Sequence, residues 1–368
     1  MSLQDEILTK SKEIQTDGYP MSIGELINMY RDEELIVNPE FQRFFRWTDS
    51  QKTKFIESIL LGIPIPPIFV SQNENGVWDV IDGLQRLSTI LEFVGILKDN
   101  SGNIVKASKL SGTKFLPSLQ DKYWDSSNSD NSFTQAQRMD FKRSKLDIKI
   151  IKKASDKDAK YELFQRINTG GTSLEPQEIR NCLLIMIDKP FYDWCVKLNK
   201  YEPFQNCIPL TEKQYSEQYD MEITIRYLVY LYCDINNIRG NEDMNDFITN
   251  EIINIAENKI IDYDYEYNRF CDTFDYLNVL LEDDVFRKFN NDKSKFYGAF
   301  SVASFELIIS GFSKNLDKIK LLNQDKIISL IKSIYNSSEY KTASNSSRPI
   351  LRFKNLKLLG EKIFSDVN

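Results

Sequence analysis

The residues best placed for chemistry are three Gln-Arg pairs, each of which lies inside an otherwise apolar run. The pairs are Gln42-Arg43, Gln85-Arg86 and Gln165-Arg166. An unpaired charge is costly to bury, so a charged pair inside an apolar run needs a partner. Convergence of the three pairs on one anionic ligand, such as a phosphate, would supply that partner. Three separate surface positions are the alternative.

Residues 78–90 give the most detailed picture of such a site. They predict a short strand, a turn at Asp82 and Gly83, and a helix that opens with Gln85 and Arg86. The free N–H groups at a helix start suit an anion, and Arg86 can add a bidentate clamp. Gly83 permits a sharp turn, and Asp82 is placed to bind a metal or to orient a water. A helix with a surface arginine is the simpler alternative.

The composition excludes several kinds of chemistry. The chain has 368 residues, enough for two domains, and contains no histidine. That excludes an HNH nuclease motif, a Ser-His-Asp triad, an HExxH zinc site and an imidazole base. Catalysis would therefore use carboxylates, arginine, lysine, hydroxyl groups or a hard metal. The net charge of −7 means that any contact with DNA must come from local basic patches.

The chain also carries indications of its cellular compartment. Its five cysteines are odd in number and show no CxxC spacing, which favours reduced thiols over a disulfide framework. The N-terminal residues are acidic and polar, so no signal peptide is predicted. The most apolar stretch, residues 59–70, contains three prolines and is too short to span a bilayer. These features predict a cytoplasmic protein.

The hydrophobic spacing changes character at about residue 181. Before this point, residues 1–20 are polar and are predicted to be frayed, and the rest alternates between strands and helices. Strands are predicted at 65–71, 77–81 and 146–151, and helices at 21–30, 84–97 and after a capping box formed by Thr48 and Gln51. After it, only helical spacing stands out, including residues 296–309. The expected fold class is α+β, with one domain over 1–185 and an all-helical domain over 186–368.

Two basic stretches are candidate contacts for DNA. One covers residues 138–153, and the other covers residues 341–360, which contain no acidic residue. Such runs are usually solvated faces, although clustered cations also bind the phosphates of DNA. The candidate DNA-binding residues are Arg348, Arg352 and Lys354.

Four motifs, in order between about residues 20 and 185, resemble the N-terminal domain family of GmrSD-type restriction proteins (domain of unknown function 262). This family is part of the ParB/sulfiredoxin-like superfamily. The motifs occupy residues 38–47, 57–68, 82–90 and 164–174, and the last is followed by Glu178. One residue departs from the family pattern, because Leu84 stands where the family has the first glutamine of Gln-Gln-Arg. If that glutamine reads a base or places a water, activity is altered in this chain.

The resemblance implies a ParB/sulfiredoxin-like domain that binds a nucleoside triphosphate, in defence against foreign DNA such as that of a phage. The implied catalytic residues are Asp82, Gln85 and Arg86. The implied nucleotide- and phosphate-binding residues are Gln42, Arg43, Gly83, Arg166, Asn168 and Thr169. In this scheme arginines neutralise phosphate charge, Asp82 binds Mg²⁺ or orients the attacking water, and Gln85 positions that water.

Three functions stay open on the sequence alone. The first is a magnesium-dependent NTP hydrolase, the second a nucleotide-sensing switch without turnover, and the third a ParB-like protein that binds or nicks DNA. Many family members carry a C-terminal HNH nuclease domain, whose active site a chain without histidine cannot supply. A separate nuclease is therefore one expected partner. The other expected partners are a nucleotide, DNA and a second copy of the chain, with no membrane.

Overall fold

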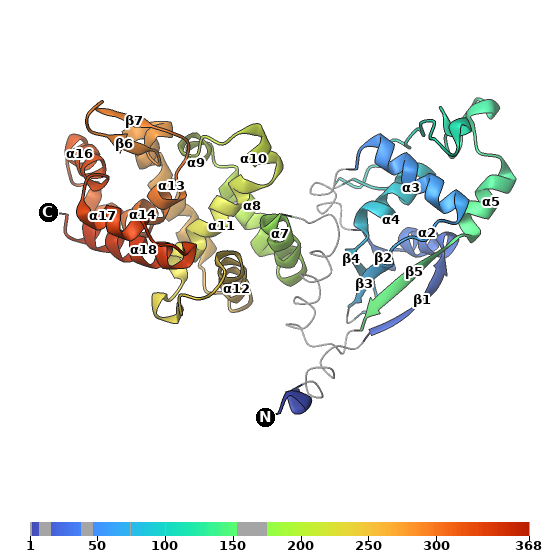
Figure 1. Ribbon diagram of the computed structural model, residues 1–368, viewed down its shortest axis with the longest axis horizontal. Coiled ribbons are helices and arrows are strands. Elements are labelled where there is room, and N and C mark those ends of the chain that lie inside the picture. Colours follow the sequence, from blue (N-terminus) through green and yellow to red (C-terminus); the bar gives the residue numbers. More distant parts are fainter. Residues whose placement is uncertain are drawn as a thin grey trace. The chain divides into compact units, whose positions relative to one another are not determined.

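The computed structural model describes residues 2–6, 16–37, 47–73, 75–99, 101–152 and 175–367. The chain divides into two compact units, Met1–Ser173 and Leu174–Asn368 (Figure 1). The domain boundary expected after residue 185 falls inside helix α7 (Pro176–Ile187), which is part of the second unit. The first unit is a mixed α/β structure, and the second is mainly helical.

A five-stranded mixed sheet forms the centre of the first unit, with the strand order β1-β5-β3-β4-β2. Its strands are β1 (Thr16–Ser22), β2 (Leu35–Ile36), β3 (Ile68–Gln72), β4 (Trp78–Asp82) and β5 (Lys145–Ile151). β5 pairs antiparallel with β1 and parallel with β3, while β4 pairs antiparallel with β3 and parallel with β2. The expectation of a frayed start was wrong for residues 16–20. This edge strand is largely exposed, so its sequence lacks the alternation that marks a half-buried strand.

Four helices pack beside this sheet and against one another (Figure 1). They are α2 (Ile23–Arg31), α3 (Asp49–Leu61), α4 (Leu84–Val94) and α5 (Gln135–Arg143). The capping box predicted at Thr48 and Gln51 is present at the start of α3. Along β5, buried Leu146 and Ile148 alternate with exposed Asp147 and Lys149, so one face of this strand is covered and the other is open.

The second unit contains twelve helices and a short hairpin among its described residues. The helices are α7, α8 (Lys189–Asn199), α9 (Glu202–Cys207), α10 (Glu212–Ser216), α11 (Tyr219–Tyr232), α12 (Met244–Glu257), α13 (Tyr263–Leu281), α14 (Val302–Phe312), α15 (Leu316–Ile319), α16 (Gln324–Ile334), α17 (Ser338–Ser344) and α18 (Pro349–Ser365). The hairpin joins β6 (Lys288–Asn290) to β7 (Lys295–Tyr297). The helix expected from residue 296 therefore begins later, at Val302. Residues 295–297 pair across the hairpin instead, where the rings of Phe289 and Phe296 lie 5.0 Å apart.

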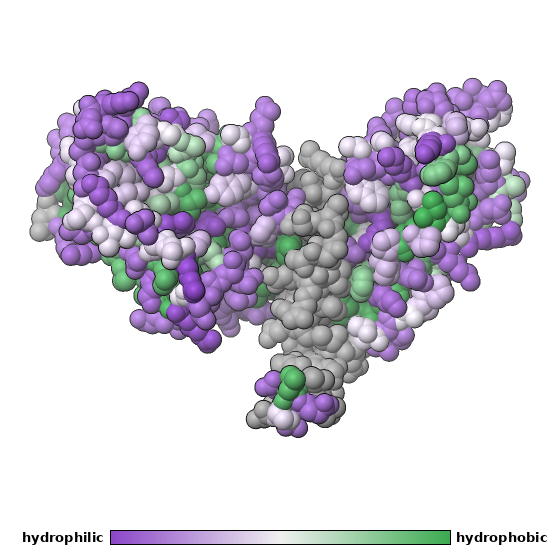
Figure 2. Space-filling model, viewed as in Figure 1, coloured by the Kyte–Doolittle hydropathy of each residue, from purple (hydrophilic) through white to green (hydrophobic). Residues whose placement is uncertain are grey.

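The drawn surface is largely hydrophilic (Figure 2), and the thiols are unpaired. Figure 2 shows that hydrophilic residues cover most of both units on the face drawn, with smaller apolar patches between them. All five cysteines are unpaired, and four of them are buried. In the described part of the chain, none of the helices combines the length and the apolar character needed to cross a membrane.

Helices α14 and α18 approach each other so closely that two glycines are required at their contact. A Cβ atom built on Gly360 would lie 2.0 Å from the carbonyl oxygen of Leu307. A Cβ atom built on Gly311 would lie 2.1 Å from the carbonyl oxygen of Gly360. Both obstacles are backbone atoms, so a larger residue fits only if the two helices move apart.

We predict that Gly360→Ala lowers the free energy of unfolding by about 1–3 kcal/mol, the usual cost of overpacking. Helix propensity alone would give the opposite sign, because alanine is favoured over glycine inside a helix by roughly 1 kcal/mol. Urea unfolding followed by circular dichroism measures the change. A variant as stable as the natural protein would show that the two helices separate without cost.

Candidate functional site

The predicted turn joins β4 to α4. Strand β4 ends at Asp82, and Gly83 adopts a left-handed conformation with φ of +88°. A Cβ atom at this position would lie 2.9 Å from Cγ1 of Ile68, so both the backbone angle and the close approach favour glycine. Helix α4 begins at Leu84, and no side chain caps its N-terminus. The first N–H groups of α4 are therefore left without a capping side chain.

The side chain of Arg86 is bound within this turn. Its Nη1 donates to the carbonyl oxygen of Pro66 and, at 3.1 Å, to that of Pro67. Its Nη2 donates to Oδ2 of Asp82 at 2.7 Å. These bonds fasten the start of α4 to the segment before β3. A guanidinium group has five N–H donors, so two of them are not used by these three bonds.

Gln85 connects the turn to the end of the upstream motif. Its Oε1 accepts a hydrogen bond of 3.0 Å from the backbone N–H of Trp47. Trp47 is the first residue described after residues 38–46, and its ring contacts that of Phe55 at 5.4 Å. Gln42 and Arg43 lie outside the described residues. The chain that carries them thus re-enters the described structure directly beside the start of α4.

Arg166, Asn168 and Thr169 also lie outside the described residues. The residues before them leave the sheet from β5, on the opposite side of β3 from β4. Strand β4 is antiparallel to β3 and β5 is parallel to it, so the C-terminal ends of β4 and β5, at Asp82 and Ile151, point toward opposite edges of the sheet. The convergence of the three Gln-Arg pairs stays a prediction, and the described structure locates one of the three pairs at the turn.

Asp82 is the candidate metal ligand at this turn. Its Oδ2 accepts from Arg86, and its side chain is 27% exposed. Within the described part of the chain, no group of three His, Cys, Asp or Glu residues is suited to hold a metal. One carboxylate is nevertheless enough for Mg²⁺ when phosphate oxygens and waters supply the other ligands.

Sequence reasoning overlooked a second carboxylate on β4. Asp79 is partly buried, and Nδ2 of Asn73 donates to its Oδ2 at 2.5 Å. Burial raises the pKa of Asp79, and the bond from Asn73 only partly opposes that effect. An aspartate between Trp78 and Val80 in a strand was the signal that could have identified it.

We predict that Asp79→Asn stabilises the first unit at neutral pH and flattens its pH dependence. The folded state holds a proton on Asp79 more tightly than the unfolded state does. Stability therefore falls as pH rises from the ordinary aspartate range through the raised pKa of the folded state. Asparagine removes this titration and the cost of the buried charge. Thermal unfolding at pH 4 and pH 7 should show a smaller difference in the variant, and an unchanged difference would contradict the assignment.

The three candidate DNA-binding residues all bind groups inside the second unit. Nη1 of Arg348 donates to the carbonyl oxygen of Gly240, and Nζ of Lys354 donates to that of Ile238, both at 3.2 Å. Arg352 binds the fully buried carboxylate of Glu306 through Nε at 2.9 Å and Nη2 at 3.0 Å. DNA binding by these residues stays a prediction, and Arg352 differs from the other two because its partner is a buried charge.

The Arg352–Glu306 pair belongs to a buried polar network that the sequence did not suggest. The hydroxyl of Tyr230 donates to Glu306 at 3.3 Å and accepts from Nη1 of Arg226 at 2.8 Å. Glu222 accepts from Arg226 and, at 2.7 Å, from Arg180 on α7. The available signal was the spacing of Glu222 and Arg226, four residues apart inside an apolar helix.

Charge balance in this network sets the pKa values of its arginines. Burial lowers the pKa of Arg180 to about 10, although Glu222 opposes the shift. Burial also opposes the charge of Arg226, but Tyr230 and Glu222 outweigh it and raise the pKa of this residue. The network joins α7, α11, α14 and α18, so it holds α7 within the second unit.

Comparison with protein families identifies the part of the chain that contains the turn. Residues 23–185 match the model of the GmrSD restriction endonuclease, N-terminal domain. These residues therefore belong to the GmrSD N-terminal domain family, as the four motifs predict. No curated protein and no solved structure matched the chain. The match includes the whole β4–α4 turn and continues into α7.

Proposed function

We propose that this protein is the nucleotide-binding and nucleotide-hydrolysing component of a restriction-like defence system that acts on foreign DNA. The observation that carries the proposal is the β4–α4 turn inside the matched family domain. There, Asp82 and Arg86 meet at a helix start that lacks a side-chain cap. This combination supplies backbone donors, a cation and a carboxylate within one turn, which are the groups that phosphoryl transfer requires.

In this proposal the first N–H groups of α4 and the remaining donors of Arg86 bind phosphate oxygens. Asp82 supplies a carboxylate oxygen to Mg²⁺ or orients the attacking water, and bound Mg²⁺ would neutralise charge on the phosphates. Gln85 acts as a positioning residue for the segment that follows Arg43, since its Oε1 accepts a hydrogen bond from the backbone N–H of Trp47. Arg43 and Arg166 add positive charge, and the first unit is a ParB/sulfiredoxin-like domain.

A nucleotide-sensing switch without turnover is the second candidate, and Leu84 favours it. This residue stands where the family has a glutamine, and its side chain is only 3% exposed. The side chain of a buried leucine offers a nucleotide no hydrogen bond. If the family's glutamine places the water, this chain binds a nucleotide and does not hydrolyse it.

A panel of nucleoside triphosphates with Mg²⁺ tests both candidates. Binding is measured by calorimetry, and release of inorganic phosphate is measured with and without DNA. Binding with phosphate release supports the hydrolase, and binding without release supports the switch. If no nucleotide binds under any condition, both proposals are wrong. Any cleavage of DNA by this chain alone could not use an HNH site, since the chain has no histidine.

We predict that any DNA binding through α18 and the residues before it is salt-sensitive and does not require Arg352. The test replaces Lys341, Arg348 and Lys354 by glutamate and leaves Arg352 in its pair with Glu306. Each phosphate contact that is lost should reduce the slope of log affinity against log salt by about one. Lys318→Glu, at an exposed position on α15, is the matched control. An unchanged affinity and slope would identify this stretch as a solvated face.

A further inference from the structure

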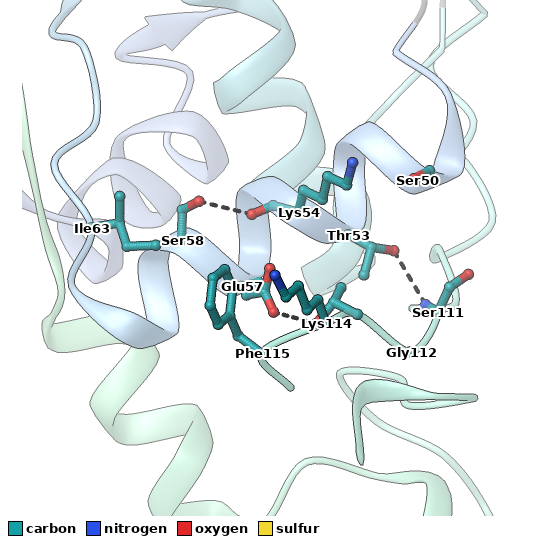
Figure 3. A pocket seen from close by; sticks show the side chains of 11 residues that line it. Ser50, Thr53, Lys54, Glu57, Ser58, Ile63, Ser111, Gly112, Lys114 and Phe115 are labelled. Carbon is teal, nitrogen blue, oxygen red and sulfur yellow. Dashed lines mark hydrogen bonds between the residues drawn. The ribbon is translucent and has the colours of Figure 1, made fainter. Parts of the chain in front are cut away.

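A pocket of about 500 Å³ lies between α3 and the loop of residues 111–115, and we call it the α3 pocket (Figure 3). Figure 3 shows α3 on one side and Lys114 and Phe115 of the loop on the other. Another face of α3 is turned toward α4, where Lys52 pairs with Glu92 at 2.8 Å. The α3 pocket is therefore a separate site from the β4–α4 turn, and its volume suits a small-molecule ligand.

The loop that forms one wall is fastened to α3 by two buried side chains. Oγ1 of Thr53 accepts from the backbone N–H of Ser111 at 3.2 Å. Oε1 of Glu57 accepts from the backbone N–H of Leu116 at 3.0 Å and from the hydroxyl of Thr113. Thr53 is 1% exposed and Glu57 is 6% exposed. The pocket is thus formed before any ligand arrives.

Two cations and an aromatic ring line this pocket. Neither Lys54 nor Lys114 has a carboxylate within ion-pair distance among the residues that the structure describes. Nζ of Lys114 lies 5.9 Å from the centre of the Phe115 ring, and Phe115 is 67% exposed. The hydrogen bonds to Glu57 all go to Oε1, so within the described structure Oε2 has no donor.

We propose that the α3 pocket binds a nucleotide through both its base and its phosphate. An exposed aromatic ring stacks on any base, and two lysines bind phosphate. The buried carboxylate of Glu57 accepts a hydrogen bond from an amino group on the edge of the base. Guanine offers an amino group beside a ring N–H, whereas uracil and thymine have no amino group. The nucleotide is either free in solution or part of a single DNA strand, because the same chemistry recognises both.

The test compares GMP, UMP and guanine- or thymine-rich single strands as ligands of the full chain. Replacing both Lys54 and Lys114 by alanine should weaken binding of the guanine ligands about tenfold to a hundredfold. Phe115→Ala should weaken it about tenfold. Glu57→Gln keeps an oxygen for Leu116 and should reduce the preference for guanine over uracil. Lys106→Ala, an exposed lysine outside the pocket, is the matched control and should bind normally.

The ligand panel also separates the two sources of nucleotide. Pocket-dependent binding of GMP alone identifies a free nucleotide, and pocket-dependent binding of the strand alone identifies DNA. The Arg86→Ala variant should retain the part of the binding that the Lys54, Lys114 and Phe115 substitutions remove, because Arg86 belongs to the other site. If the pocket variants bind like the natural protein while Arg86→Ala does not, nucleotides bind only at the β4–α4 turn and the inference is wrong. If the full chain binds none of these ligands, the inference is also wrong, and this result does not depend on whether the protein hydrolyses nucleoside triphosphates.

Discussion

Glu306→Ala is expected to lower the free energy of unfolding by about 3–5 kcal/mol, the usual cost of removing one partner from a buried ion pair. The carboxylate of Glu306 is fully buried and accepts two bonds from Arg352 and one from Tyr230. Its removal leaves the guanidinium groups of Arg352 and Arg226 with less compensating charge in a region shielded from water. Urea unfolding of the full chain, followed by circular dichroism, measures the loss.

A double variant separates lost charge balance from lost packing. Glu306→Leu combined with Arg352→Met removes both charges and keeps the volume, so it should recover most of the stability lost in Glu306→Ala. Asp283→Ala is the matched control. It breaks the exposed pair with Arg287 and should cost less than about 1 kcal/mol. If Glu306→Ala costs no more than Asp283→Ala, the network contributes little to the fold.

The Glu306 experiment also changes how DNA binding must be tested. Charge reversal at Arg352 would place a second carboxylate beside buried Glu306. Such a variant is expected to be less stable, and an unfolded helical unit would lose any DNA binding even if Arg352 never touches DNA. The salt dependence of variants that retain Arg352 gives the discriminating measurement, because unfolding and lost phosphate contacts then have different signatures.

Local signals were sufficient to predict the elements that form the turn. Three signals indicated the turn: the strand pattern of residues before Asp82, the Asp-Gly pair, and the helical spacing of apolar residues after that pair. All three concern residues close together in sequence. Thr48 and Gln51 likewise form a contact three residues apart. Each of these features is set by backbone preferences within one segment, so the sequence contains the information directly.

The features that sequence reasoning missed depend on partners far away in the chain. Strand β1 forms because residues 16–22 pair with residues 145–151, and its own sequence is polar and largely exposed. The sequence showed an arginine at the start of α4 but could not show that carbonyl groups 19 and 20 residues earlier accept its hydrogen bonds. The same holds for Arg352, whose partner lies 46 residues away. Long-range pairing decides whether a charged residue faces a ligand or the protein itself.

Arg86→Ala is expected to have two effects, because Arg86 both closes the turn and offers donors to a phosphate. Loss of its bonds to Pro66, Pro67 and Asp82 should lower the free energy of unfolding by about 2–4 kcal/mol, since hydrogen bonds to charged groups are among the stronger ones. Loss of its contact with the ligand should weaken nucleotide binding about tenfold to a hundredfold. Thermal unfolding and calorimetry, both on the full chain, measure the two effects separately.

Binding must be compared at a temperature where circular dichroism shows each variant to be folded. Arg86→Lys keeps the charge and loses the planar fork, so it should restore little of the affinity if the contact is bidentate. Arg31→Ala removes an exposed arginine from α2 and is the matched control for net charge. Asp82→Asn retains an acceptor for Arg86, and should spare binding while abolishing phosphate release. If folded Arg86→Ala binds nucleotides as the natural protein does, Arg86 only supports the turn, and the phosphate site must be sought elsewhere in the domain.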